Sequence, residues 1–96
     1  MNVRYSHTAL QGLTLIGERT TALRGKRTAK EVGKKLRIIL EKDLPAFPFR
    51  GREGRVAGTR ELLLTPLPYL VVYRVGSDTV EILATFHQAQ DRAQEL

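Results

Sequence analysis

Four arginines lie within one short glycine-rich segment, which reads Arg-Gly-Arg-Glu-Gly-Arg-Val-Ala-Gly-Thr-Arg from residue 50 to residue 60. Guanidinium groups bind phosphate and carboxylate in bidentate geometry, and glycines let backbone amides approach an anion. Arg50, Arg52, Arg55 and Arg60 are therefore the best candidates for binding an acidic partner. The alternative is a solvated loop whose glycines only serve turns. The segment lacks the Gly-Lys-Ser/Thr signature of a P-loop.

His87 is the candidate for proton transfer, because imidazole titrates near neutral pH. No acidic residue or second histidine stands at a recognisable spacing from it, so a strand-end histidine bonded to backbone or solvent is the simpler interpretation. The chain has no cysteine and no evident metal-ligand cluster or nucleophile–base pair, so we expect neither a metal nor a cofactor. Glu61 and Glu81 are expected to form cross-strand ion pairs with Arg60 or Arg74.

A weak first helix is expected to follow a short strand at residues 3–6. Thr8 opens this helix with Gln11 in the capping-box position, and two glycines within it lower its stability. Its apolar face is expected to consist of Leu10, Leu13 and Ile16. A basic linker at residues 19–27 is expected to separate it from the next helix.

The second helix is expected to begin at Thr28, with Glu31 completing a capping box. Its apolar residues recur at helical spacing as far as about Lys42 and are expected to face the core; they are Ala29, Val32, Leu36, Ile39 and Leu40. Pro45 and Pro48 then forbid its continuation.

Three strands are predicted after the helices, at residues 60–64, 69–75 and 79–87, because apolar and polar residues alternate there. A proline-containing turn joins the first two, and Gly76-Ser77-Asp78 joins the second pair. The predicted fold class is α+β in the order β-α-α-β-β-β, with an N-terminal helix hairpin packed on a small, mainly antiparallel sheet. The length fits one domain over residues 1–96.

The last hairpin predicts which side chains share a face. If Ser77 and Asp78 form a two-residue turn, Tyr73 faces Ile82 and Val72 faces Leu83. The all-apolar face that packs on the helices would then contain Val71, Tyr73, Val75, Val80, Ile82, Ala84 and Phe86. The opposite, mixed face is a candidate binding surface near solvent, with Leu70, Val72, Arg74, Glu81, Leu83, Thr85 and His87. A change of one residue in register would reverse this assignment.

The charge is unevenly distributed along the chain. Residues 1–60 contain 14 Lys/Arg and 5 Asp/Glu, whereas residues 61–96 contain 2 and 5. A basic front half indicates a polyanionic partner, either nucleic acid or an acidic protein segment. Lys30, Lys34 and Arg37, with Lys35 beside them, are interpreted as the solvated face of the second helix. No apolar run long enough to span a membrane and no signal-peptide core is present, so a cytoplasmic location without membrane contact is expected.

Two motifs are distinctive. Gly-Arg-x-Gly-Arg-Val-x-Gly-Thr-Arg-Glu-Leu at residues 51–62 is followed by Pro-Tyr-x-Val-Val-Tyr-Arg-Val at residues 68–75. Together they resemble the RelE/ParE superfamily of small bacterial toxins, most closely its ParE branch. The resemblance implies the toxin of a type II toxin–antitoxin pair, neutralised by an acidic or amphipathic segment of an antitoxin. Residues 19–27 and 34–37 depart from the ParE branch in being more basic.

The resemblance also divides the possible activities. RelE-like members cleave messenger RNA on the ribosome with several basic side chains, whereas ParE-like members poison DNA gyrase. Leu70 stands where RelE-like enzymes carry a catalytic arginine, which leaves only Arg60 and His87 for RNA chemistry. We therefore expect a gyrase-binding toxin with no catalytic residue of its own. The alternatives are a ribosome-dependent mRNA endoribonuclease that uses Arg60 and His87, and a non-toxic basic nucleic-acid-binding module.

Both toxin readings give the same set of candidate contact residues for the target or the antitoxin. These are Arg50, Arg52, Arg55, Arg60, Leu70, Val72, Arg74, Leu83 and His87.

Overall fold

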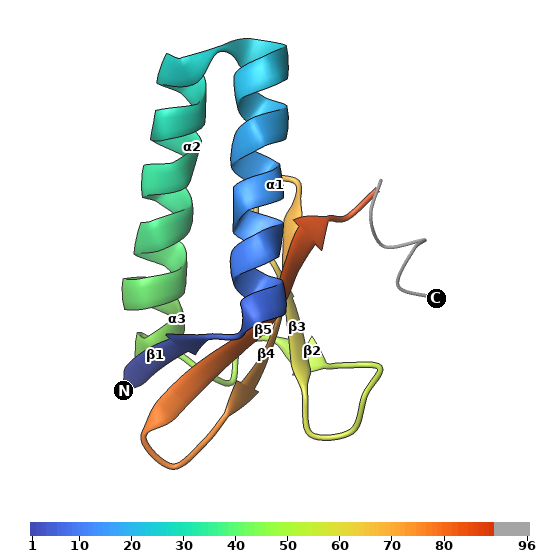
Figure 1. Ribbon diagram of the computed structural model, residues 1–96. Helices are drawn as coiled ribbons and strands as arrows, with labels where there is room; N and C mark the ends of the chain where they lie inside the picture. The colour runs from blue at the N-terminus through green and yellow to red at the C-terminus, as the bar shows by residue number, and fades with distance from the viewer. Residues whose placement is uncertain (90–96) are drawn as a thin grey trace.

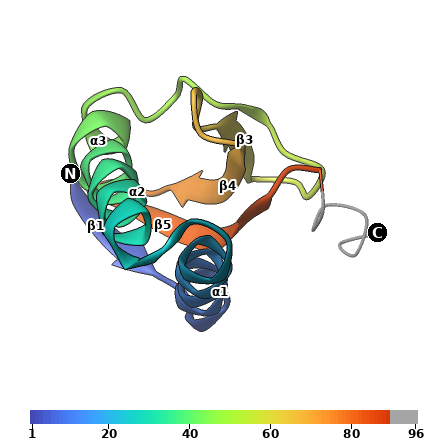
Figure 2. The ribbon, with the colours of Figure 1, turned by 90° about the horizontal axis from the view of Figure 1, so that it is seen from above.

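Two long helices pack side by side on one face of a five-stranded sheet (Figures 1 and 2). The computed structural model describes residues 1–89. The elements are β1 (Asn2–Tyr5), α1 (His7–Arg24), α2 (Lys26–Ile38), the π-helical turn η1 (Ile39–Asp43), α3 (Leu44–Ala46), β2 (Arg52–Glu53), β3 (Arg60–Leu63), β4 (Tyr69–Val75) and β5 (Thr79–His87). The predicted α+β class is confirmed, and β2 was not foreseen.

The sheet is mostly antiparallel, as expected. The strands are arranged in the order β1-β5-β4-β3-β2. Strand β1 runs parallel to β5, and every other neighbouring pair is antiparallel. The helical hairpin provides the crossover that a parallel β1–β5 pair requires.

Helix α1 is longer than the sequence suggested. Ser6, not Thr8, is its N-cap, and the Ser6 Oγ accepts a hydrogen bond of 3.0 Å from the Ala9 N–H. The helix continues to Arg24, so the linker expected at residues 19–27 is wrong. The reason is that the segment contains no proline, and its inner face packs on β5 and α2, which outweighs the weak propensity of its glycines.

A single glycine, Gly25, joins the two helices. Its φ of 90° lies in the left-handed region, which a glycine adopts without steric strain. Helix α2 therefore starts at Lys26, and the capping box predicted for Thr28 and Glu31 is wrong. The hairpin extends beyond the sheet at this end (Figure 1).

The helical path also continues past the point where Pro45 was expected to stop it. The Leu44 N–H donates to the Ile39 carbonyl, five residues back, so the helix widens into a π turn. Pro45 then occupies the first turn of α3, where no backbone N–H is needed. The helix ends at Phe47, where the chain enters residues 47–60, which we call the Arg-Gly segment.

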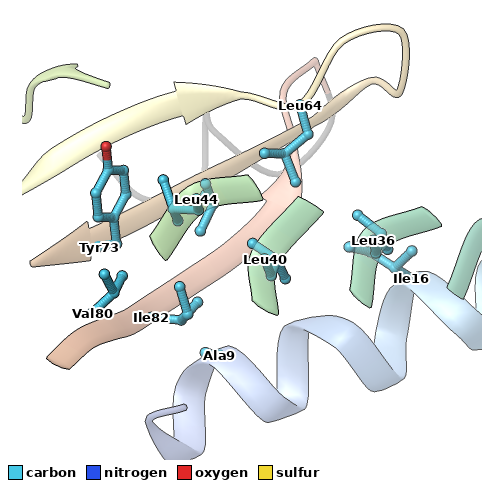
Figure 3. Packing of buried hydrophobic residues seen from close by; sticks show 10 residues of the cluster. Ala9, Ile16, Leu36, Leu40, Leu44, Leu64, Tyr73, Val80 and Ile82 are labelled. Atoms are coloured by element: carbon cyan, nitrogen blue, oxygen red, sulfur yellow. The ribbon is translucent and has the colours of Figure 1, made fainter. Parts of the chain in front are cut away.

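The hydrophobic core lies between the sheet and the two helices (Figure 3). Its members come from every long element and include Ala9, Ile16, Leu36, Leu40, Leu44, Leu64, Val71, Tyr73, Val80 and Ile82. The predicted roles of Leu36 and Leu40 are confirmed. Leu10 was expected on the inner face of α1 but is 49% exposed, because Ala9 occupies the position against the sheet.

The β4–β5 register matches the prediction next to the turn and differs beyond it. Tyr73 faces Ile82 and Val75 faces Val80, as expected, but Val72 faces Ala84 instead of Leu83. The extra residue forms a β-bulge, which shifts every later pair by one position. From Ala84 to His87, each side chain of β5 therefore lies on the opposite face of the sheet from the one predicted.

One contact fixes this assignment. The Thr85 hydroxyl donates a hydrogen bond of 3.1 Å to the Ala9 carbonyl in α1, so Thr85 faces the helices. The prediction that Thr85 and His87 share the mixed face is wrong, as is the placement of Ala84 and Phe86 against the helices. Alternation alone could not reveal this, because a bulge leaves no period-two signal.

Candidate partner-binding surface

The Arg-Gly segment is anchored on the sheet by Tyr73. The Tyr73 hydroxyl donates to the Pro48 carbonyl at 2.7 Å and accepts from the Gly51 N–H at 2.9 Å. Tyr73 is fully buried, and burial raises the pKa of its hydroxyl, although the Gly51 amide and the nearby Arg60 and Arg50 act in the opposite direction. The hydroxyl is therefore a neutral donor and acceptor at the base of the segment.

Gly51 is required by this arrangement. A Cβ atom at this position would lie 2.6 Å from the Tyr73 hydroxyl and 2.9 Å from the Glu61 carbonyl oxygen. Both distances are shorter than real Cβ contacts, so the close approach of the segment to β3 and β4 depends on the missing side chain.

Arg60, on β3, binds the backbone at the start of the segment. Its Nη1 donates to the Gly51 carbonyl at 2.7 Å and to the Phe49 carbonyl at 3.2 Å. Its guanidinium carbon also lies 4.9 Å from the centre of the Phe49 ring, within cation–π range. Arg60 therefore positions the backbone on both sides of Arg50 and the ring of Phe49.

Glu61 closes the turn between β2 and β3. Its carboxylate is 3% exposed and accepts from the Arg55 backbone N–H at 3.1 Å and from Arg52 Nη2 at 3.3 Å. The expected ion pair between Glu61 and Arg60 is wrong, because neighbouring residues on a strand point to opposite faces. The pair predicted between Arg74 and Glu81 is confirmed at 3.7 Å.

The segment presents its remaining groups outward. Arg50, Arg52 and Arg55 are exposed, so the structure leaves them accessible to a partner. Two aromatic rings precede them in the chain and are also exposed: Phe47 is 70% exposed and Phe49 is 63% exposed. Sequence reasoning did not select these two rings, although phenylalanines flanking a proline in a polar segment were a usable signal.

The mixed sheet face is less open than expected. Leu70, Val72 and Arg74 do share this face, on β4, but Leu70 is only 4% and Val72 only 9% exposed. Leu63 and Phe86 flank Leu70, and Glu61 and Ala84 flank Val72. The expectation that these two side chains lie near solvent is therefore wrong. Leu83 sits in the bulge and is half-buried.

His87 lies on the helix side of the sheet, apart from Arg50, Arg52 and Arg55, and shares a cavity with Arg19 and Arg24 of α1. Its ring makes an edge-on contact with Tyr69, with ring centres 5.9 Å apart, and its Nδ1 accepts from the Ala89 N–H at 3.2 Å. Both side chains border a cavity of about 190 Å³ that α1 closes from the other side.

Arg60 and His87 do not form one site. Arg60 is paired with Tyr73 and His87 with Tyr69, at opposite ends of β4. Four residues of extended strand separate the two positions by about 13 Å. Within residues 1–89 there is also no group of His, Cys, Asp or Glu side chains placed to bind a metal ion.

A second cavity, of about 280 Å³, lies between α1 and α2. Gly17, Ala29 and Gly33 line it, and the Tyr5 hydroxyl donates to Glu41 at 2.7 Å beside it. Sequence reasoning missed this cavity, although small residues at matching positions of two helices indicate a thinly filled interface.

Among residues 1–89, none of the helices has both the length and the apolar character that a membrane span requires.

Comparison with known proteins identifies relatives along almost the whole chain. Residues 3–92 match the family described as "ParE toxin of type II toxin-antitoxin system, parDE". A curated protein of Sinorhizobium fredii, "Putative toxin Y4kP", is 34% identical over 97 residues, which cover 98% of this chain and 95% of the relative.

Solved structures share the fold. A chain of the chromosomal ParDE toxin–antitoxin system of P. aeruginosa superimposes with a TM-score of 0.74 at 22% identity, covering 91% of this chain and 95% of that one. A chain of the RelBE2 complex of Mycobacterium tuberculosis gives 0.65 at 24% identity, covering 90% and 95%. E. coli YafQ gives 0.53 at 19% identity, covering 92% and 93%.

Proposed function

The chain belongs to the ParE toxin family of type II toxin–antitoxin systems, and from this premise we propose that it arrests growth by binding DNA gyrase. The proposed action is inhibition by contact, without bond-making by the toxin itself. Gyrase is a cytoplasmic enzyme, so the proposal also assigns the toxin to the cytoplasm. An antitoxin encoded with it is proposed to hold it inactive.

The separation of Arg60 from His87 is the observation that favours binding over catalysis. Stabilising a phosphoryl-transfer transition state requires several donors and cations that converge on one oxygen-rich centre. Arg60 donates to two backbone carbonyls, His87 lies at the other end of β4, and Leu70 supplies no polar group between them. The predicted nuclease residues therefore have no common substrate position.

The exposed side of the Arg-Gly segment is the proposed contact surface. Arg50, Arg52 and Arg55 supply positive charge, and the rings of Phe47 and Phe49 supply apolar area beside it. Arginine and aromatic side chains are the types that dominate binding energy at protein interfaces. Leu70 and Val72 are too buried to contribute in this conformation, whereas Arg74 on the same face is exposed and stays in the proposed set.

The same surface suits an antitoxin. An acidic or amphipathic chain would pair its carboxylates with the arginines and its apolar side chains with the two rings. Structural neighbours were solved as toxin–antitoxin systems, which supports the existence of such a partner for this chain.

The test is to follow labelled thymidine and labelled amino acid incorporation in bacteria during the first minutes after induction of the chain. Gyrase inhibition predicts that DNA synthesis falls first while translation continues. The purified protein should then inhibit supercoiling by gyrase, and Phe49→Ala should weaken that inhibition by at least about tenfold, as expected for an interface anchor.

Two outcomes would replace the proposal. If translation stops first and messenger RNA is cut only when ribosomes are present, the chain is a RelE-like endoribonuclease. If neither synthesis changes while the folded protein accumulates, the non-toxic nucleic-acid-binding module becomes the better description.

A further inference from the structure

The positive charge of the protein is concentrated in the helical hairpin. Residues 19–40 contain eight Lys/Arg and one Glu, a net charge of +7, whereas the whole chain carries +6. The other residues together carry −1, even though they include the Arg-Gly segment. The hairpin therefore dominates the electrostatic field of the molecule at long range.

Four of these cations form one ridge along α2. Lys26, Lys30, Lys34 and Arg37 are spaced four, four and three residues apart, so they follow one another on one side of the helix over about 16 Å. All four are exposed. The buried Leu36 and the partly buried Val32 lie on the other side of α2, against α1. We call these four residues the α2 ridge.

The structure makes the ridge longer than the sequence predicted. Because α2 begins directly after Gly25, Lys26 and Arg27 are helical and not part of a flexible linker. Arg24 in the last turn of α1 adds charge at the same end of the hairpin. This end extends beyond the sheet and is open to a large partner (Figure 1).

Among residues 1–89, no ridge residue forms an ion pair with an acidic side chain. The described ion pairs involve Arg4, Arg52 and Arg74 with Glu61 and Glu81, all on the sheet. Like charges four residues apart on a helix destabilise it by a few tenths of a kcal/mol per pair. Because this row of cations lowers the stability of α2, it indicates a binding role more than a structural one.

We propose that the α2 ridge binds the phosphate backbone of double-stranded DNA without sequence preference. A polyanion of regular charge spacing matches a regular row of cations, and lysine ammonium groups contact phosphates as point charges. An acidic protein helix would need apolar anchors along the contact, and the ridge itself contains none. Only the choice of DNA over RNA rests on the proposed gyrase target, because gyrase acts while holding DNA.

The test is fluorescence anisotropy of a 20-base-pair DNA duplex with the purified protein, in about 50 to 200 mM KCl and without gyrase. The parent should bind with micromolar affinity at the lowest salt, and log K should fall linearly with log salt concentration. The double variant K30Q/K34Q should bind at least about tenfold more weakly at 100 mM KCl, and the magnitude of the salt slope should drop by about 2. Gln keeps high helix propensity, so the fold is retained.

The matched control is R50Q/R55Q, which removes the same charge from the Arg-Gly segment and should change affinity by less than about threefold. The variant K30R/K34R keeps the charge and should bind like the parent. The proposal fails if the duplex does not bind, if R50Q/R55Q loses more affinity than K30Q/K34Q, or if poly-glutamate of equal charge binds more tightly than DNA. Because gyrase is absent from this assay, such a failure would leave the gyrase proposal standing.

Discussion

The hydroxyl of Tyr73 donates a hydrogen bond of 2.7 Å to the carbonyl of Pro48. Twenty-five residues separate the two along the chain, and the bond ties the centre of the core to the first residues of the exposed Arg-Gly segment. The same hydroxyl accepts from Gly51, so one side chain sets the backbone path on both sides of Phe49 and Arg50. The position of the proposed contact surface therefore depends on a residue that no partner could touch.

Tyr73→Phe should loosen the segment without unfolding the protein. The change leaves the half-buried Pro48 carbonyl and the buried Gly51 N–H without their partner, which costs about 1–3 kcal/mol of unfolding free energy. Trypsin should then cleave after Arg50, Arg52 or Arg55 several-fold faster than in the parent, while the far-ultraviolet circular dichroism stays the same.

Tyr69→Phe is the control for this variant. Among residues 1–89, the one polar contact of the Tyr69 hydroxyl is a long one of 3.5 Å with Thr20, so its removal should cost less than about 0.5 kcal/mol and leave trypsin cleavage unchanged. Equal cleavage rates for the two variants would contradict the anchoring role of Tyr73.

Stability should decline at alkaline pH from about pH 10 upward, near the pKa of an unfolded tyrosine. Burial raises the pKa of Tyr73 above the usual value of 10.0. The pKa of Tyr5 is raised as well, by burial first and then by its hydrogen bond to Glu41. The folded state thus keeps protons that the unfolded chain releases, so the stabilisation is complete below pH 10 and is lost as pH rises through the folded pKa.

Urea unfolding between pH 8 and pH 11 measures this effect. The parent should show constant stability up to about pH 9.5 and a decrease above it. Tyr73→Phe should show a smaller decrease, since one of the two shifted groups is gone. A decrease of the same size in both proteins would assign the whole effect to Tyr5.

Glycines at two positions in the helices should respond to alanine in opposite directions. At Gly12, a Cβ atom would lie 2.2 Å from the Thr85 carbonyl oxygen on β5, so α1 would have to move away from the sheet. Gly12→Ala should lower the unfolding free energy by about 1–3 kcal/mol. At Gly33 no atom lies within 4 Å of the added Cβ, and Gly33→Ala should raise it by up to about 1 kcal/mol.

Thermal unfolding of the two variants decides this prediction. A stabilising Gly12→Ala would show that α1 and β5 are less closely packed than their contact at Thr85 indicates. A destabilising Gly33→Ala would mean that the α1–α2 cavity beside Gly33 cannot accept a methyl group.

The sequence predicted the fold where local patterns and long-range packing agree. The alternation in residues 69–75 and the turn at Ser77 and Asp78 fixed the first pairs of the β4–β5 hairpin correctly. The apolar spacing of Leu36 in α2 and Leu40 in η1 likewise identified the buried side of the second helical segment. In these places a side-chain period and a buried surface have the same cause.

The errors occur where the backbone departs from a regular period. The bulge at Leu83 moved His87 to the helix side, and the π turn at residues 39–43 let the helix pass Pro45. Neither feature changes the composition of its segment, so no pattern of residue types could indicate it. The basic stretch at residues 19–27 is helical except at Gly25, because basic residues are good helix formers and only the glycine interrupts the helix.

His87 provides the most direct separation of a gyrase-binding toxin from a ribonuclease. A general acid or base typically contributes a factor of 10² to 10⁴ to a reaction rate. If the chain binds gyrase through the Arg-Gly segment, His87→Gln should change supercoiling inhibition by less than about twofold, because His87 lies beside Tyr69, about four residues along β4 from the Tyr73 that anchors the segment. If the chain cleaves messenger RNA with His87, the same variant should lose at least about hundredfold in ribosome-dependent cleavage.

A matched variant is needed because His87 also packs in the structure. Its edge-on contact with Tyr69 and its bond from the Ala89 N–H both stabilise the end of β5. Gln88→Ala changes the next residue, which is exposed, and should leave both activities intact. Loss of supercoiling inhibition in His87→Gln but not in Gln88→Ala, with equal melting temperatures, would place His87 in the contact surface and overturn the assignment of that surface to the Arg-Gly segment.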